Sequence, residues 1–294
     1  MERPVRPVLA PGVRVLRRSS GDLQVGIVAG RRVVLPDTDP VRRTLGRLSR
    51  GETLAADPDT DRVLALLGPV LVEGGGMGTP GVAPGDLAAA ALLDPLDYPT
   101  RVARRRDARI GVDGTLGAGD PLPLLTAAGL GTADRGDRDR TAVLVLRVGE
   151  VDRDHLDPLV RAGLPHLLVR LVEGEALVGP FVAPGRTACV RCLDAHRVLD
   201  APETPVLAAQ HARARDERRD GVPEPVDSAL ATLATAWAVR DLVTHADGGQ
   251  PSTWSATVHL TATLAAVTRT DWLRHPACGC NWLLDDLHSR TMVG

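Results

Sequence analysis

Four cysteines arranged as two close pairs constrain this chain more than any other feature of its sequence. Cys189 and Cys192 form a C-x-x-C step, Cys278 and Cys280 form a C-x-C step, and the chain has no other cysteine. Two thiolate pairs from distant parts of a chain supply the four sulfur ligands of a closed tetrahedral Zn²⁺ site. Four buried free thiols or two disulfides are the alternatives, but disulfides between the pairs would need an oxidising compartment. We therefore expect a structural zinc ion that ties the C-terminal tail back to the middle of the chain.

The composition is that of a globular protein without a nucleic-acid or membrane partner. Hydrophobic residues make up 44% of the 294 residues, and no apolar run approaches the roughly 18 residues of a membrane span. The net charge of −2 and the aromatic content of 2% argue against general nucleic-acid binding and base stacking. The N-terminus lacks the apolar run of a signal peptide, so we expect a cytoplasmic protein.

Lysine is absent, so all 35 residues in the Lys+Arg count are arginine. This absence excludes a phosphate-loop lysine and a Schiff-base lysine. No G-x-S-x-G or H-E-x-x-H motif is present either. His196, His275 and His288 flank the cysteine pairs, where we expect them to lie near the metal or on the surface rather than to bind it. We expect no catalytic residue.

Residues 1–75 are predicted to form a small winged-helix-like α+β domain. Three short apolar segments separated by Gly-containing turns predict strands at 13–16, 23–27 and 32–35. Apolar residues at helical spacing predict a helix over 40–48, a second helix follows Asp57 or Asp59, and 69–72 is strand-like. Residues 76–107, which begin with a stretch rich in Gly, Pro and Ala, are predicted to be a linker.

Residues 108–294 alternate between strand and helix signals, which is typical of an α/β fold. Continuous apolar segments predict buried parallel strands at 108–112, 142–146 and 165–172. Helices are expected up to Ala128, over 154–162 and from Asp227 or Ser228 onward. Later strands predict an antiparallel tail through 176–182, 254–260 and 264–269. The expected fold is a Rossmann-type sheet with an antiparallel tail that the zinc site holds in place.

Two parts of this domain resemble ThiF/MoeB-type adenylating enzymes, the ubiquitin-activating superfamily. A strand, a Gly-rich turn at 113–119 and a helix ending Ala128-Gly129-Leu130-Gly131 resemble the nucleotide-binding start of these enzymes. Residues 178–192 and the run His275-Pro276-Ala277-Cys278-Gly279-Cys280 resemble their zinc-bearing tail. The chain is most similar to the ThiF-like partner of YcaO cyclodehydratases, which binds the leader of thiazole/oxazole-modified peptides. That resemblance implies a winged-helix domain that holds a leader peptide as an added strand.

The nucleotide loop of the superfamily is only partly retained here. Aligned on its G-x-G-x-x-G turn, Val112 replaces the first glycine, whereas Gly114 and Gly117 remain. Pro121 and Pro123 remove amide donors near the start of the following helix. We interpret Gly114 and Gly117 as a vestigial nucleotide loop, and the alternative is a tight strand-to-helix turn without a ligand.

The segment after this loop argues further against ATP chemistry. Residues 132–140 are too few for the strands and crossover that carry nucleotide-handling side chains in the superfamily. The strand at 142–146 is not followed by the expected catalytic Asp, and Glu150 or Asp152 would be substitutes without partners visible in the sequence. We therefore expect ATP-dependent adenylation to be lost.

The leading hypothesis is a non-catalytic ThiF-like scaffold. It would bind a precursor peptide through its first domain and present it to a YcaO-type cyclodehydratase, and the superfamily also suggests a homodimer. The alternative is an ATP-dependent adenylyltransferase acting on the C-terminus of a small protein or peptide.

Overall fold

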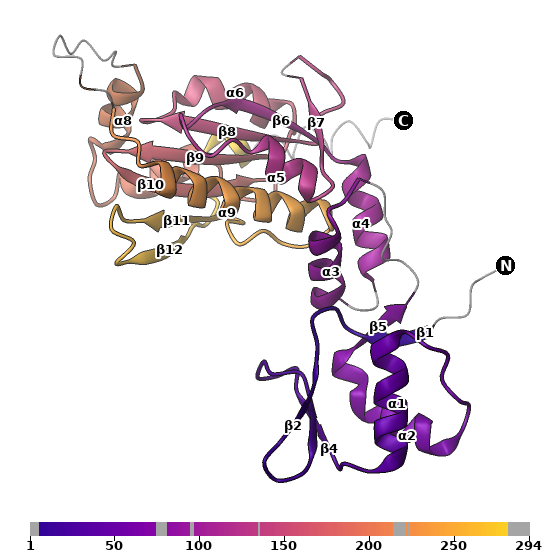
Figure 1. The fold of residues 1–294 in the computed structure, drawn as a ribbon. Helices are drawn as coiled ribbons and strands as arrows, with labels where there is room; N and C mark the ends of the chain where they lie inside the picture. Colours follow the sequence, from indigo (N-terminus) through magenta and orange to yellow (C-terminus); the bar gives the residue numbers. More distant parts are fainter. Residues whose placement is uncertain are drawn as a thin grey trace. The chain divides into compact units, whose positions relative to one another are not determined.

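The chain folds into two units, Met1–Ala103 and Arg104–Gly294 (Figure 1). The computed structural model describes residues 6–74, 81–94, 97–134, 136–213, 222 and 224–281. Among these residues, no helix is both long and apolar enough to cross a membrane.

The first unit contains a three-stranded antiparallel sheet and two helices. Strands β2 (Val15–Arg17), β3 (Leu23–Val25) and β4 (Val33–Leu35) lie in that order in the sheet, close to the predicted segments. Helices α1 (Asp39–Arg50) and α2 (Pro58–Leu67) follow, each with a proline in its first turn. The Asp57 side chain caps α2 by accepting a hydrogen bond from the Thr60 amide at 2.9 Å. Apolar side chains from all these elements share one core.

The same unit contains a second small sheet, a further helix and the first part of another, which continues past Ala103 into the second unit. Strand β1 (Arg6–Leu9), which the sequence analysis did not anticipate, pairs antiparallel with β5 (Leu71–Gly74), and the short helix η1 (Gly68–Val70) precedes β5. Helices α3 (Pro84–Leu93) and α4 (Tyr98–Asp107) occupy much of the predicted linker.

The linker prediction for 76–107 is therefore wrong over these two helices, while 75–80 and 95–96 lie outside the described residues. Leu87, Ala91, Tyr98 and Val102 are buried in a common core. The Ala/Leu-rich segment favours a helix, and its Gly and Pro residues lie before or in the first turn, where they are tolerated.

The second unit is built on a seven-stranded mixed sheet with the order β12-β11-β10-β9-β8-β6-β7. Its four parallel strands are β6 (Arg109–Gly114), β7 (Gly131–Ala133), β8 (Ala142–Val148) and β9 (His166–Val172). Its antiparallel strands are β10 (Glu175–Val182), β11 (Ala256–Leu260) and β12 (Val267–Asp271). The predicted mixed α/β fold is confirmed. Residues 132–140 were considered too few for a further strand. The first two of them, Thr132 and Ala133, nevertheless belong to β7, a three-residue strand at the edge of the sheet.

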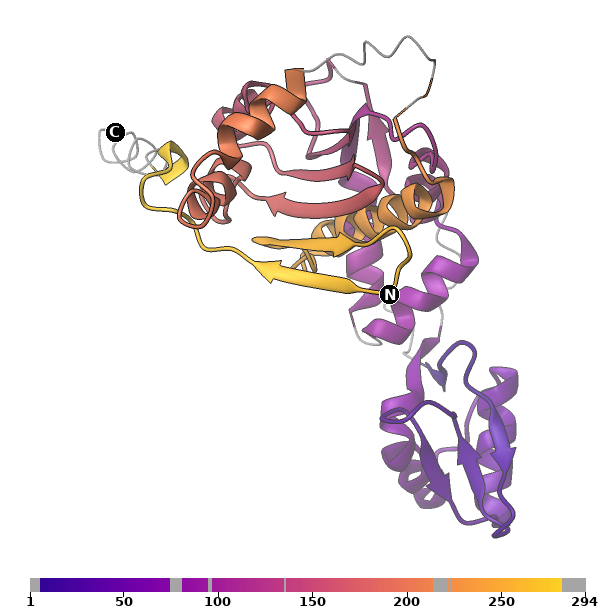
Figure 2. The same ribbon diagram turned by 90° about the vertical axis from the view of Figure 1, so that its left-hand side faces the viewer.

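Helices cover both faces of this sheet (Figures 1 and 2). Helices α5 (Leu122–Ala127) and α9 (Ser228–Ala246) pack on one face, against Leu144, Val169 and Val178. Helices α6 (Arg153–Arg161) and α7 (Val190–Arg197) cover the other face, against Val143 and Leu168. Helix α8 (Thr204–Arg213) buries none of its side chains, and η2 (Gly279–Asn281) carries part of the second cysteine pair.

Candidate functional site

The structure brings the four cysteines together. Cys189 is the N-cap of α7 and Cys192 lies in its first turn, while Cys278 and Cys280 come from the segment that follows β12. All four thiols are buried, and their sulfur atoms lie within 4.8 Å of one another. Sγ–Sγ distances are 3.8 Å for Cys189–Cys192, 3.6 Å for Cys189–Cys278 and 3.5 Å for Cys192–Cys280. The cluster could hold a metal ion.

The donor set and its spacing fit zinc. Four sulfurs bound at about 2.3 Å to a tetrahedral Zn²⁺ ion lie about 3.8 Å apart. Without a metal, the crowded thiols share protons. Hydrogen bonding with Cys189 lowers the pKa of Cys278 to about 7, whereas hydrogen bonding with Cys192 raises the pKa of Cys189. A divalent cation would replace these shared protons with metal–thiolate bonds.

The flanking histidines lie beside the cluster rather than in it. The His196 ring nitrogen Nε2 lies 2.9 Å from the carbonyl oxygen of Leu273, and the His196 and His275 rings meet edge to face at 4.9 Å between centroids. Among the described residues, the four cysteines are the one group of side chains close enough together to hold a metal ion. His288 lies outside the described residues. A cavity of about 290 Å³ reaches three of the cysteines, between Arg161 on α6 and Arg191 on α7.

A second cluster lies where β6 and β8 end. Open α/β sheets bind ligands at the carboxyl ends of their strands, where neighbouring connections run in opposite directions. Here β7 and β8 flank β6, so this point lies between β6 and β8. Asp113 on β6 contacts the His155 ring, and both contact the Arg147 guanidinium of β8, at 3.1 Å for Asp113 and 2.7 Å for His155. Burial raises the pKa of Asp113, but its contacts with His155 and Arg147 outweigh burial and leave that pKa lowered.

Gly114 of the predicted nucleotide loop adjoins this cluster. Gly114 has a φ of 95°, and a Cβ atom there would come within 2.2 Å of Arg147 Nη1. That nitrogen donates hydrogen bonds to the carbonyls of Asp113 and Leu146, both at 2.7 Å. Gly117 also has a positive φ, 78°, and its amide donates to the Thr115 hydroxyl at 3.0 Å. Arg147 therefore lies against Gly114, and the Gly117 amide is engaged within the loop.

The proposed substitutes for a catalytic Asp have definite partners. Glu150 accepts hydrogen bonds from Arg153 at 2.7 Å and from Arg170 at 2.5 Å. Burial raises the pKa of Glu150, but the charges of Arg170 and Arg153 outweigh burial, so the net pKa is lowered. Asp152 instead caps α6 through the Asp154 amide and pairs with Arg213. Glu150 is thus part of a buried ion-pair network.

Most contacts of this network join residues that are far apart in the sequence and were not predicted from it. Arg153 donates two hydrogen bonds to Asp194 on α7, each at 2.9 Å, which links α6 to α7. Arg147 and Arg170 are register partners on β8 and β9. A usable signal was present for the two strand residues, because Arg147 and Arg170 each interrupt an apolar strand.

No family model and no curated protein match this sequence. Solved structures do share its fold. The heterocyclase TruD superposes with a TM-score of 0.68 at 17% identity, covering 98% of this chain and 44% of the TruD chain. Escherichia coli MccB bound to ATP gives 0.61 at 12% identity, covering 94% of this chain and 99% of MccB. MccB, a microcin C7 biosynthetic enzyme, in complex with N-formylated MccA gives 0.60 at 11% identity, with the same coverage.

At these identities the comparisons show a common fold and no more. The chain spans less than half of TruD and nearly all of MccB. The likeness to TruD and MccB is therefore a likeness of architecture.

Proposed function

We propose that this chain is a non-catalytic ThiF-like scaffold that binds a precursor peptide. Its first unit would act as a winged-helix-like peptide-recognition domain. The scaffold would present the bound leader to a YcaO-type cyclodehydratase in the cytoplasm, during the biosynthesis of an azole-modified peptide. The shared fold supports a role in peptide modification, because TruD is a heterocyclase and MccB has been solved in complex with MccA.

The main support for peptide binding by the first unit is the outer strand β4, which is directly followed by α1. β4 is at one end of its three-stranded sheet, and its Val34 side chain is 45% exposed. An outer strand can accept an extended peptide as one more strand, and neighbouring side chains then provide specificity. Arginines at 42, 43, 47 and 50 lie on α1, with Asp39 as its single acid. An acidic leader segment is the matching partner.

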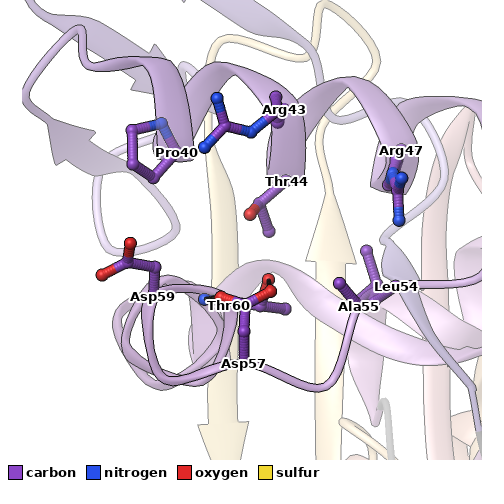
Figure 3. Close-up of a pocket in the computed structure, with 9 residues that line it drawn as sticks. All are labelled: Pro40, Arg43, Thr44, Arg47, Leu54, Ala55, Asp57, Asp59 and Thr60. Atoms are coloured by element: carbon purple, nitrogen blue, oxygen red, sulfur yellow. Dashed lines mark hydrogen bonds between the residues drawn. The ribbon is translucent and has the colours of Figure 1, made fainter.

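A small pocket between α1 and α2 could receive a side chain of that peptide. It has a volume of about 90 Å³, and Figure 3 shows Thr44 pointing from α1 toward Asp57 and Thr60 at the start of α2. Arg43 and Arg47 line the α1 wall, and Asp57 and Asp59 line the other. The two walls therefore carry opposite charges, which suits a polar side chain.

The second unit supports a structural role. We propose that the four cysteines hold a structural Zn²⁺ ion, which would occupy every thiol of the chain and leave no cysteine nucleophile. Arg147 packs against Gly114 at the carboxyl end of β6, where a nucleotide would bind. Peptide binding without chemistry is the function that these features support best.

The test uses a labelled precursor peptide encoded beside this chain's gene, with binding measured by fluorescence anisotropy on the full chain. Val34→Asp places a charge beside the proposed added strand and is expected to weaken binding at least about tenfold. Leu16→Asp is the matched control, because Leu16 is 39% exposed and occupies the same register level on the opposite outer strand, β2. Equal affinity of Val34→Asp and the unaltered chain would rule out the β4 site.

An adenylyltransferase is the alternative function. Its specific support is the overlap with MccB in complex with ATP, which extends over 94% of this chain. It would require the cluster at Asp113, Arg147 and His155 to rearrange around a nucleotide.

A further inference from the structure

Arg170 is a buried cation whose hydrogen bonding is incomplete. Its side chain is 1% exposed, in the middle of the apolar strand β9. Nη1 donates to Glu150 Oε1, but Nε and Nη2 are buried and contact no acceptor among the described residues. A buried donor without an acceptor, and above all a charged one, is costly, so such groups are nearly always paired.

The two unmatched donors lie on one edge of the guanidinium, and other arginines of this chain show what that edge binds. Arg105 uses its Nε and Nη2 to hold both oxygens of Asp247, at 2.6 and 2.8 Å. Arg153 holds Asp194 and Arg191 holds Asp157 through the same two atoms. The Nε–Nη2 edge is a two-pronged donor that matches the oxygens of a carboxylate or a phosphate. On Arg170 this edge has no such partner in the described part of the chain.

The surrounding charges are also unbalanced. Arg153, Arg170 and Arg197 contribute three positive charges, whereas Glu150 and Asp194 contribute two negative charges. Arg197, at the end of α7, is half-buried and lies over the Trp272 ring at 5.4 Å. Burial and the charge of Arg170 lower the pKa of Arg197, although Glu150 and Asp194 oppose this effect. One positive charge therefore remains unmatched in this network.

The network lies beneath a weakly held element. His211 on α8 approaches the amide of Glu150 at 3.3 Å, and Arg213 pairs with Asp152 at 3.2 Å. No side chain of α8 is fully buried, and elements with so little buried contact open at lower free-energy cost than the core. A small ion can therefore reach a donor that is buried in the closed form.

We propose that the Nε–Nη2 edge of Arg170, together with Arg197, binds an external oxyanion, a carboxylate or a phosphate. The anion completes the hydrogen bonding of Arg170 and balances the network. This site lies on the α6–α7 face of the sheet, one strand beyond the Asp113–Arg147–His155 cluster. It requires neither peptide binding by the first unit nor any reaction with ATP.

The experiment titrates inorganic phosphate and, separately, acetate into the metal-loaded full chain at constant ionic strength, with chloride as the reference salt. Isothermal calorimetry is expected to show one saturable site for at least one of the two anions. Binding of phosphate alone identifies a phosphate-bearing ligand, and binding of acetate alone identifies a carboxylate. Arg197→Met should weaken binding at least about tenfold, as expected for loss of a charge-assisted contact.

Arg170→Lys tests the two-pronged edge directly, because it keeps the charge but removes the paired donors, and it should also weaken binding. If that variant does not fold, the half-buried Arg197→Met still decides the question. Arg240→Met is the matched control, since Arg240 is an exposed arginine on α9, across the sheet. Absence of binding by both anions, or binding that Arg197→Met leaves unchanged, would overturn the proposal.

Discussion

His166 and Arg170 lie four residues apart on the same face of β9. Both are ionisable groups buried in an apolar strand. The two side chains differ in their charge state when buried. Arg170 keeps its charge and draws Glu150 into the network. His166 is fully buried, and its Nδ1 lies 3.0 Å from the Leu164 carbonyl oxygen. Burial lowers the pKa of His166 to about 4, so the folded protein holds it neutral.

This shift predicts a loss of stability on mild acidification. The unfolded chain protonates His166 near pH 6.5, whereas the folded chain does so only near pH 4. Between these values the unfolded state binds more protons, so the contribution of His166 to the free energy of unfolding falls as pH falls, by about 3 kcal/mol in all. His166→Gln should flatten the dependence of urea-unfolding free energy on pH between 6.5 and 4. Equal slopes for His166→Gln and the unaltered chain would contradict the assignment.

At the scale of elements, α7 joins the cysteine cluster to the charged network. Cys189 is its N-cap and Cys192 lies in its first turn, while Asp194 and Arg197 lie in its second turn. The segment after β12 contributes Trp272 beneath Arg197 and then the second cysteine pair. A metal in the cluster would therefore anchor the C-terminal segment to α7 and hold Arg197 in place.

Cys192→Ser tests this link. Removing one of four thiolates should lower bound zinc well below one equivalent and increase hydrogen exchange over 272–280, because that segment depends on the metal for its attachment. Zinc content is measured by atomic emission and exchange by mass spectrometry, with α9 as an internal reference. His196→Asn is the matched control: it alters a side chain beside the cluster and should retain full zinc. Equal loss of zinc in both variants would mean that His196 takes part in binding the metal.

At the scale of the whole molecule, the proposed carrier role is favoured over adenylation because side chains of the second unit occupy the carboxyl ends of β6 and β8. Arg147 is the main reason. Its guanidinium contacts Asp113, His155 and the backbone at Gly114, where open sheets of this type bind their ligands. Helix α5 supports the same conclusion, because it has only six residues, follows Pro121 and carries Pro123 in its first turn, so it offers few free amides to an anion.

ATP–pyrophosphate exchange separates the two proposed functions. We expect no exchange above the protein-free background, with or without the precursor peptide, with an active ThiF-type enzyme as the positive control. Exchange that requires the peptide and is abolished by Asp113→Asn would instead establish adenylation and place Asp113 in its site.

Local signals explain how far the sequence could be read. Strands such as β8 and β9, the Asp57 and Asp227 caps and the glycine-marked turns each depend on a few adjacent residues, so their positions followed from the chain itself. The same local reasoning misjudged 76–107, because it took Gly and Pro for a linker where they precede or begin helices.

The sequence by itself determined the mixed α/β fold and the arrangement of the cysteines as two close pairs. Apolar periodicity and the spacing of metal ligands depend only on residues that are near one another in the sequence. The tertiary structure alone decided which charges meet. Glu150, Arg170 and Asp194 come from a loop, a strand and a helix, and they become neighbours only through strand order and register. Burial then gives these contacts their importance, because a charge removed from water must find its partner within the fold or bind one from outside.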